Sequence, residues 1–432
     1  MMEMKNKAIT AARERMLFVW RIPSFPVLFL INFILGLSSS FFAPFSSLFG
    51  IDEVGMSNVG FGIFMTVTAL GGVTISSYIA KLSDTSLSRK KIMVLATFAG
   101  IIGYTLYAFL RNYYTLALTG FFILGVTGAA VPQLWAYARD ALKQANIPST
   151  DTPFIMNIFR MFFALAWTVG PALGAWLLQL IGFKGLFLFV ASGYLLVFLT
   201  ITFLLKDLSA QEVTIVKTPP LSVGNYVKRP QIFAFLAATF LLSCAISIHM
   251  LNVPQFVTKV LHGTEMDVGM VFSVPPVFEV PLMILIGIWA TKIDNSKLIK
   301  IGFGTAFVYF LLFGFVKEPW QIYPLQLLSA AQVSITGGIA ISYFQDFIPE
   351  AQGTATTLYM NTTSIGSTLG FLLFGIISEI FSYGTLIIFY TIFAGAGLLF
   401  LILAGKKRPN TAALAAEEQQ IKRESVKNGI SS

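Results

Sequence analysis

The 432-residue chain is 56% hydrophobic and only 11% charged, with a mean hydropathy of +0.77. Because soluble proteins carry about 25% charged residues, this composition excludes a soluble globular protein of this length. The net charge of +9 would also suit a nucleic-acid-binding protein, but the positions of the charges along the chain argue against a nucleic-acid partner.

Apolar runs of roughly 20 residues recur along the chain, and each is long enough to span a hydrocarbon core of about 30 Å. In lipid, backbone groups must be paired within a helix or a closed barrel, and these runs lack the alternation of barrel strands. We therefore predict an all-α integral membrane protein. The twelve predicted spans are 27–49, 59–80, 92–110, 114–136, 154–181, 185–205, 231–258, 268–290, 298–316, 321–344, 354–381 and 383–404.

The positive charges are distributed unevenly between the loops. If both termini are cytoplasmic, Arg111, Lys184, Lys259 and Lys317 lie outside and Arg160 lies within a span, while the other Lys and Arg residues fall on the cytoplasmic side. This asymmetry follows the positive-inside rule, so we predict cytoplasmic termini and a multi-pass protein in a lipid bilayer. The basic excess then sets topology and is not a nucleic-acid-binding patch.

The two halves of the chain share a pattern. Pro44 aligns with Pro254, and Asp84 aligns with Asp294 at the same spacing, each aspartate lying in a short charged loop between two apolar runs. An internal duplication of this kind predicts two pseudo-symmetric bundles of six helices, an architecture typical of transporters. The predicted divisions are a cytoplasmic N-terminal segment 1–26, a first bundle 27–205, a cytoplasmic linker 206–230, a second bundle 231–404 and a cytoplasmic tail 405–432.

Cysteine and histidine usage limits the chemistry of the chain. Cys244 is the single cysteine, which excludes an intrachain disulfide. With only two histidines in addition, neither a Cys-rich nor a His-ligated metal site is expected. The sequence also lacks a catalytic constellation. We therefore expect no cofactor, no metal and no enzymatic activity.

The loop between the second and third spans resembles the signature loop of the major facilitator superfamily, Gly-x-Leu-Ala-Asp-Arg-x-Gly-Arg-Lys. The resemblance rests on Asp84 and the basic run 89–91, since Ala80 and Leu87 replace the two glycines of the signature. In the fifth span, the stretch 166–175 contains a Gly-Pro pair and resembles a motif common in exporters of that superfamily. The resemblance implies the fold of that superfamily, with twelve transmembrane helices in two bundles.

A closer resemblance is to the bacterial sugar efflux transporters of the superfamily. It is most specific in the Tyr-Phe-Gln-Asp stretch 343–346 and in the stretch 355–362, which reads Ala-Thr-Thr-Leu-Tyr-Met-Asn-Thr. The resemblance implies export of sugars such as lactose, glucose or galactosides by proton antiport with alternating access. It also implies a monomer in a bacterial inner membrane. The other segments that carry it are 52–55, 132–139, 165–171 and 325–328.

The resemblance implies a gating function for the charged loops. A carboxylate at the end of one helix can pair with basic groups or cap a neighbouring helix, so that one conformation is held until a competing contact releases it. The basic residues could instead only anchor the topology. The gating candidates are Asp84, Arg89, Lys90 and Lys91 in the first loop and Asp294 in the second.

Arg160 lies about seven residues inside the fifth span, roughly 10 Å from its cytoplasmic end. A charge at that depth is costly unless it faces water or a partner, so Arg160 is a candidate functional residue, although its side chain could also snorkel to the surface. Trp167 follows two turns later on the same helix face. Because tryptophan can stack on a sugar ring while a guanidinium donates to hydroxyl groups, we hypothesise that both line the substrate cavity. Trp135, in contrast, fits the aromatic belt at the membrane surface.

Glu279 is the acid predicted deepest in the membrane, in a stretch of the eighth span that contains three prolines. A carboxyl group at that depth can bind and release a proton as its surroundings change, which suits a proton-coupled exporter. Glu279 could instead form a static pair with Arg160, since the fifth and eighth spans are neighbours in this superfamily. His249, in the middle of the seventh span, could relay protons, bond a sugar hydroxyl or be a neutral packed side chain.

Further polar side chains lie on spans that face the central cavity in this superfamily. Amides and a phenol suit neutral polyols better than anions or lipophilic cations, although some of these groups must instead bond helices together. Gly170 and Gly174, in contrast, are spaced for close helix contact. The remaining substrate-binding candidates are Asn32, Gln133, Asn157, Gln326, Gln332, Tyr359 and Asn361.

Two other functions compete with sugar export. A multidrug exporter of the same superfamily is favoured by the 14 methionines and 42 phenylalanines, which suit a plastic apolar cavity, although most of the phenylalanines must face lipid. A non-transporting membrane sensor is disfavoured because the sequence contains no soluble signalling domain. The choice of sugars over drugs depends on the stretches 343–346 and 356–361.

Overall fold

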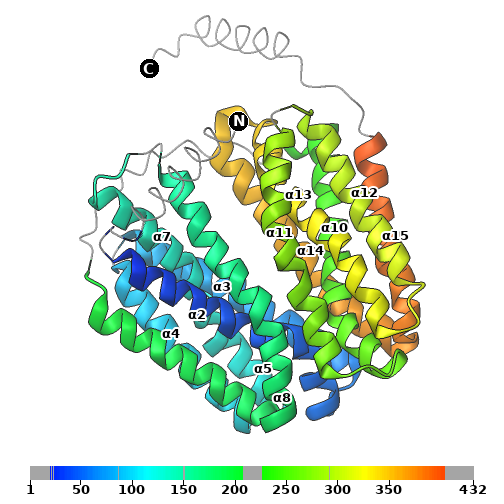
Figure 1. The fold of residues 1–432 in the computed structure, drawn as a ribbon, viewed down its shortest axis with the longest axis horizontal. Helices are drawn as coiled ribbons and strands as arrows, with labels where there is room; N and C mark the ends of the chain where they lie inside the picture. The colour runs from blue at the N-terminus through cyan, green and yellow to red at the C-terminus, as the bar shows by residue number, and fades with distance from the viewer. Residues whose placement is uncertain are drawn as a thin grey trace, which may run out of the picture.

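The computed structural model describes residues 24–85, 87–148, 151–207, 226–290 and 292–403, together with Trp20 and Ile22. Within these ranges the regular secondary structure is helical, without strands (Figure 1). The predicted tail, most of the predicted N-terminal segment and most of the predicted linker lie outside the described residues.

Eleven helices of the described ranges are long and apolar enough to cross a membrane. One of them, α8 (Thr152–Leu204), contains two of the predicted spans. Gly182 interrupts α8 with φ 63° and ψ −176°, a backbone conformation that glycine adopts without steric cost. The predicted all-α architecture with twelve spans is therefore confirmed, with the fifth and sixth spans joined at Gly182.

The helices form two bundles that lie side by side (Figure 1). Besides α8, the N-terminal bundle contains α2 (Phe25–Phe42), η1 (Ala43–Phe45), η2 (Leu48–Glu53), α3 (Asn58–Thr85), α4 (Arg89–Phe109), α5 (Tyr113–Leu118), η3 (Thr119–Leu124), α6 (Gly125–Thr127) and α7 (Ala130–Gln144). The C-terminal bundle contains α10 (Pro230–Gln255), η4 (Phe256–Val260), α11 (Glu265–Ala290), α12 (Asn295–Phe313), η5 (Pro319–Gln321), α13 (Ile322–Gln345), η6 (Pro349–Ala351), α14 (Gln352–Ile380) and α15 (Tyr383–Leu403). The segments α5, η3, α6 and α7 follow one another as a single span.

Aromatic side chains fill the interior of the bundles. In the N-terminal bundle, the rings of Phe49 and Phe187 lie 4.7 Å apart, and those of Tyr104 and Tyr194 stack at 5.4 Å. Large apolar side chains also remain on the molecular surface, and Phe203 is 76% exposed. Such exposure is expected where a helix faces lipid tails, because these are as apolar as the side chain itself.

Small residues let the helices of each bundle approach closely, as predicted for Gly170 and Gly174. A Cβ on Gly170 would collide with Ser40 of α2, and a Cβ on Gly174 would lie 3.0 Å from an aromatic ring of the same helix. The second half repeats this arrangement. Cβ atoms on Gly366 and Gly370 of α14 would lie 2.6 and 2.7 Å from backbone oxygens of α10. These glycines therefore set the distance between neighbouring helices.

The two bundles meet at one end of the molecule and part at the other. We name the end with the connections 42–58 and 380–383 the outer end, and the end with the connections 85–89 and 345–352 the inner end. In Figure 1 the inner end is at the top for the C-terminal bundle and at the upper left for the N-terminal bundle. Close packing between the bundles, of α3 against α14 and of α8 against α11, is found toward the outer end. By the predicted topology, the inner end faces the cytoplasm.

Candidate functional site: a cavity between the two bundles

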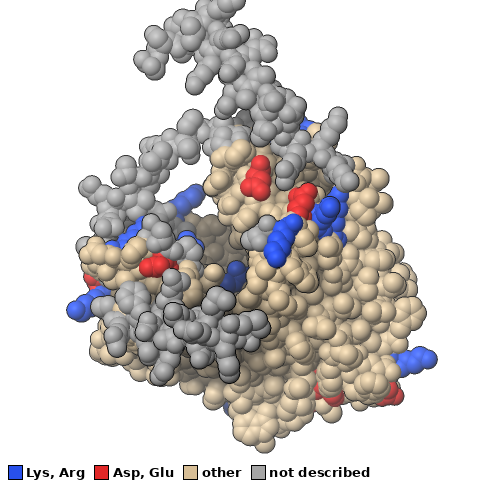
Figure 2. Space-filling view, turned by 45° about the horizontal axis from the view of Figure 1, so that its top comes forward, with Lys and Arg blue, Asp and Glu red and all other residues tan. Residues whose placement is uncertain are grey.

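A hollow opens between the bundles at the inner end. Figure 2 shows this face, with the hollow between the two halves and a basic side chain inside it. Asn157 and Arg160 of α8 are exposed. Pro171, three turns further along the same face of α8, packs against Gly269 of α11, where a Cβ would lie 2.7 Å from the Pro171 carbonyl oxygen. This face of α8 therefore lines the hollow at Asn157 and Arg160. Further toward the outer end, at Pro171, it packs against α11 and closes the hollow.

The Arg160 side chain extends across the hollow toward the other bundle. Its Nη2 atom lies 3.8 Å from the position that a Cβ would occupy on Gly337 of α13. Within the described ranges Arg160 has no hydrogen-bond or ion-pair partner, although its charge acts on Glu279 of α11. The guanidinium donors of Arg160 therefore remain free to bind a molecule in the hollow.

Glu279 lies on the opposite wall, in a helix that contains Pro275, Pro276 and Pro281. Its side chain is half-buried, and its backbone oxygen accepts a hydrogen bond from Ser334 Oγ at 3.2 Å. Its carboxylate interacts electrostatically with the charge of Arg160. Among the described residues, however, no ion pair within 4.0 Å joins the two side chains. In this conformation the two side chains thus face the hollow without a direct contact between them.

Trp167 is half-buried two turns from Arg160 on α8. On α14, Asn361 is exposed and Tyr359 is half-buried, its ring stacked on Phe235 at 6.2 Å. The structure therefore leaves Asn157, Arg160, Trp167, Tyr359 and Asn361 at least partly accessible. The other predicted ligands lie inside the bundles.

Asn32 is buried and joins helices of the N-terminal bundle. Its Nδ2 donates to the Phe159 oxygen at 2.6 Å, and its Oδ1 accepts from Trp135 Nε1 at 3.0 Å. These bonds connect α2 with α7 and α8, which supports a structural role for Asn32. Trp135 is half-buried, and its ring also packs against Phe159 and Phe163 of α8.

Four further predicted ligands also bond to protein groups. Gln133 is 5% exposed and accepts from Arg89 Nη1 at 3.4 Å. Gln326 is buried and bonds to the Tyr309 hydroxyl, and Gln332 is buried and donates to a threonine hydroxyl one turn further along α13. His249 is 9% exposed, lies within the C-terminal bundle and bonds to the same Tyr309 hydroxyl. In this conformation these side chains do not face the hollow.

The basic residues of the first charged loop bond to other helices. Arg89 Nε lies 2.6 Å from Asp140 Oδ2 of α7. Lys90 Nζ donates to the carbonyl oxygens of Thr202 and Leu205, at the end of α8, where a cation is favoured by the helix dipole. Lys91 is exposed, and the Asp84 side chain lies outside the described part of the chain. Arg89 and Lys90 therefore connect the start of α4 with α7 and α8.

Asp140 was not among the residues singled out from the sequence, although a signal for it exists. It ends the stretch 137–140, Tyr-Ala-Arg-Asp, which matches the stretch 343–346 of the second half, Tyr-Phe-Gln-Asp. Both stretches lie at the inner ends of equivalent helices, α7 and α13. A comparison of the two halves could therefore have identified Asp140 as the partner of the basic loop.

Asp294 does not occupy the position of Asp84. Asp294 is the N-cap of α12, where its Oδ1 accepts from the Ser296 backbone N–H at 3.1 Å, whereas Asp84 lies in the last turn of α3. The corresponding N-cap of α4 is Ser88. The alignment of the two aspartates is therefore wrong by about one helical turn, because spacing alone cannot locate a helix end.

A group of contacts at the outer end joins the two bundles. Asp52 of η2 accepts from Gln255 Nε2 at 2.9 Å and pairs with Lys259 Nζ at 2.5 Å. Asn58 at the start of α3 donates to the Ser378 oxygen of α14 at 2.8 Å. We name these residues the outer latch, since their contacts exist only while the outer ends of the bundles are together.

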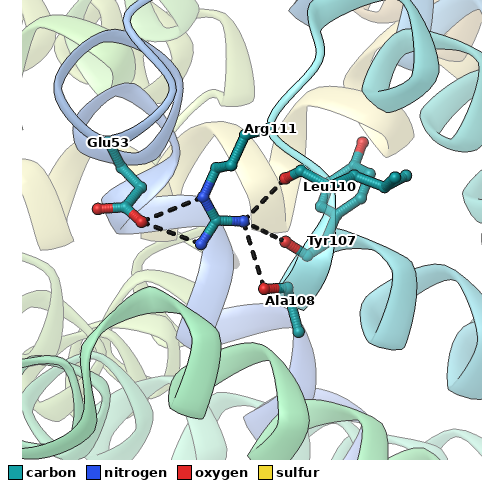
Figure 3. A network of polar contacts seen from close by, with 5 residues as sticks. All are labelled: Glu53, Tyr107, Ala108, Leu110 and Arg111. Carbon is teal, nitrogen blue, oxygen red and sulfur yellow. Dashed lines mark hydrogen bonds and ion pairs between the residues drawn. The ribbon is translucent and has the colours of Figure 1, made fainter.

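Glu53, next to Asp52, bonds within its own bundle (Figure 3). Arg111 places two nitrogens 2.9 and 3.1 Å from Glu53 Oε1, and its third nitrogen donates to the last carbonyl oxygens of α4, among them Leu110 at 2.8 Å. The guanidinium thereby fixes η2 to the end of α4. Asp52 is then held where it can reach the C-terminal bundle.

Neutralising Asp52 is expected to weaken outer closure only modestly. Both side chains of the pair are more than a third exposed, at 36% for Asp52 and 44% for Lys259, and exposed pairs contribute about 0.2–1 kcal/mol. Asp52→Asn should therefore shift the inner-open population by no more than about fivefold. Labelling of a thiol in the hollow measures this shift. The charge-swapped pair Asp52→Lys with Lys259→Asp should restore it, and failure to do so would show that the pair itself is not responsible.

Comparison with known proteins identifies relatives over most of the chain. The pattern that defines the Major Facilitator Superfamily matches residues 28–366 and 235–430. A Deinococcus radiodurans protein named as a sugar efflux transporter is 32% identical over 351 residues, 81% of this chain and 90% of the relative. Sugar efflux transporter C of Escherichia coli is 28% identical over 357 residues, 83% of this chain and 90% of that protein.

More distant similarities complete the comparison. Multidrug resistance protein MdtG of Proteus mirabilis is 20% identical over 391 residues, 86% of this chain and 92% of that protein. The crystal structure of the nucleoside transporter NupG matches with a TM-score of 0.72 at 15% identity, covering 88% of this chain and 99% of that one. At this identity the structural likeness concerns the fold alone.

Proposed function

This chain belongs to the Major Facilitator Superfamily, and on that basis we propose that it is a secondary transporter that exports sugars by proton antiport. The observation that carries the proposal is its similarity to sugar efflux transporters, at 28–32% identity over more than four-fifths of the chain. The relative named for multidrug resistance is only 20% identical. The proposal therefore favours sugars over lipophilic drugs.

The exposed side chains of the hollow suit a neutral polyol. Arg160 presents nitrogen donors with no described partner, and Asn157 and Asn361 add amides that can both donate and accept. Trp167, on the same helix as Arg160, offers an apolar ring face for the C–H side of a sugar. In this proposal Arg160 orients the sugar by its hydroxyl groups while Trp167 supports the ring.

The way the two bundles meet supports the proposal of alternating access. In this structure the hollow is open at the inner end while the outer latch is closed. Sugar would enter from the cytoplasm, and a rocking of the bundles would then close the inner end and open the outer end. We propose a monomer in a bacterial inner membrane with both termini cytoplasmic, in agreement with the positive-inside distribution.

Uptake into inverted membrane vesicles with an acidic interior tests the proposal directly. Radiolabelled lactose or a glucose analogue should accumulate, and an uncoupler should abolish the accumulation. Accumulation that resists the uncoupler would contradict proton coupling. Extrusion of a lipophilic dye without sugar accumulation would contradict the sugar assignment and indicate a multidrug exporter.

Glu279→Gln is expected to abolish uphill sugar accumulation while downhill exchange of sugar continues. Glu279 faces the hollow near Arg160, so its carboxyl group is placed to release a proton when the sugar binds and to rebind one afterwards. Glutamine retains the shape of the side chain but cannot titrate. Proton-driven accumulation and counterflow are measured in the same vesicles. Full proton-driven accumulation in the variant would exclude Glu279 as the proton carrier.

A further inference from the structure

One face of α10 carries buried polar side chains that the sugar cavity does not use. His249, Asn252 and Gln255 are spaced three residues apart and are 9%, 0% and 0% exposed. Each has one polar atom without a hydrogen-bond partner, namely His249 Nδ1, Asn252 Oδ1 and Gln255 Oε1. Tyr390 of α15 is also buried, and its hydroxyl likewise has no partner. The three unpartnered atoms of α10 lie in the last two turns of the helix, next to the outer latch.

The hydrogen bonds around His249 determine whether its unpartnered ring nitrogen is a donor or an acceptor. Gln326 Nε2 lies 3.3 Å from the Tyr309 hydroxyl, which lies 3.0 Å from His249 Nε2. If Tyr309 donates to Nε2 while accepting from Gln326, the proton of the neutral imidazole is on Nδ1. If Tyr309 instead donates to Gln326 Oε1, at 3.5 Å, Nε2 carries the proton and Nδ1 is an acceptor. His249 Nδ1 is thus a donor or an acceptor according to the tautomer, whereas Asn252 Oδ1 is an acceptor.

The unpartnered groups lie close together but do not bond directly to one another. The rings of His249 and Tyr390 have their centroids 5.1 Å apart, and the Asn252 side chain lies beside the Tyr390 hydroxyl outside hydrogen-bond geometry. The rest of the surroundings is apolar, since the rings of Phe310 and Phe313 lie 5.1 and 4.8 Å from His249. A ring nitrogen, a hydroxyl and an amide oxygen close together match the bonding capacity of water, which both donates and accepts and typically makes about three hydrogen bonds in a protein interior.

We propose that α10, α12 and α15 enclose a binding site for ordered water, bounded by His249, Asn252 and Tyr390 and continued toward Gln255. The site is separate from the sugar cavity and does not depend on the transported substrate. It lies directly behind the outer latch, because Gln255 Nε2 donates to Asp52 and Asn252 Nδ2 donates to the Tyr383 oxygen. Opening of the latch frees Gln255 and gives this water access to the outside.

Tyr390→Phe tests the proposal through the sign of a stability change. The substitution removes only the hydroxyl group, which has no protein partner among the described residues. If the hydroxyl binds water, its removal costs a hydrogen bond and should lower the thermal unfolding midpoint. If the site is dry, removal relieves an unpaired buried group and should raise the midpoint. An unchanged or raised midpoint would overturn the proposal.

Tyr309→Phe serves as the matched control, since its hydroxyl bonds to His249 and Gln326 and its loss should lower the midpoint in either case.

X-ray footprinting of the unmodified protein provides a second test that does not depend on the folding of a variant. Hydroxyl radicals formed from bound water should oxidise Tyr390 several-fold faster than Tyr107, which is equally buried in the N-terminal bundle. Equal oxidation of the two tyrosines would contradict a water site. Neither measurement involves sugar, so failure here leaves the proposed transport function untouched.

Discussion

Arg160→Ala is expected to reduce proton-driven sugar uptake by about 10- to 100-fold. Hydrogen bonds from charged donors contribute about 1.5–3 kcal/mol each, and about 1.4 kcal/mol corresponds to a factor of ten. Within the described ranges the Arg160 guanidinium has no hydrogen-bond partner when no sugar is bound. Its donor groups can therefore form hydrogen bonds with the sugar without breaking bonds to the protein. Initial rates of uptake into inverted vesicles, normalised to the amount of protein, measure the effect.

Two further variants separate the charge of Arg160 from its shape. Arg160→Lys retains the positive charge but loses the planar fork of donors, so uptake should be intermediate. Lys184→Ala removes a positive charge near Gly182, where the side chain lies 4.7 Å from the Phe109 ring, and should leave uptake unchanged. Wild-type uptake in Arg160→Ala would exclude this residue from the sugar site. An equal loss in Lys184→Ala would indicate a general charge effect.

Gly62→Ala is expected to shift the protein away from the inner-open conformation by about 5- to 150-fold. A Cβ on Gly62 of α3 would lie 2.8 Å from the Gly375 Cα and 2.9 Å from the Phe371 oxygen of α14. Both atoms belong to the backbone and cannot rotate away, and overpacking of this kind costs about 1–3 kcal/mol, which corresponds to that shift. The cost arises only while the outer ends of the bundles are in contact. The shift should therefore exceed that of the Asp52→Asn latch variant.

A single thiol in the hollow measures the shift caused by Gly62→Ala. In a Cys244→Ala background, Asn361→Cys should react with an impermeant thiol reagent from the inner side more slowly when Gly62→Ala is present. Gly72→Ala is the control on the same helix, because no atom lies within 4 Å of its added Cβ, while the gain in helix propensity is the same. Unchanged labelling in Gly62→Ala would show that this glycine contact does not determine outer closure.

Much of the architecture could be predicted from the sequence, because the physical requirement that decides it applies to each segment of the chain separately. Each apolar run must satisfy its own backbone in lipid, so run length and composition indicate a helix wherever they occur. The close contacts of Gly170 and Gly174 were predictable for the same reason, since a three-residue gap between two glycines already leaves one face of a helix free of side chains.

The candidate site could be predicted only in part. Arg160 stood out because a charge within an apolar run is costly wherever it lies, and the structure leaves its side chain exposed in the hollow. Asn32 and His249 looked equally suitable as polar residues within spans. Their bonds to the Phe159 oxygen and the Tyr309 hydroxyl depend on how neighbouring helices are rotated, which a pattern within one helix does not specify. The inter-bundle pairing of Asp52 with Lys259 depends in the same way on contacts far apart in sequence.

The sequence by itself therefore determined that this protein is an all-α membrane protein with twelve spans, because the bilayer imposes its constraints on each segment separately. Its likeness to a transporter superfamily came from the resemblance of short motifs. Only the tertiary structure decided which polar side chains remain free to bind a ligand. Arg160 and Asn361 are exposed, whereas Asn32, Gln326 and His249 bond to neighbouring helices. A buried polar group requires a partner, and the position of that partner is set by the packing of helices against one another.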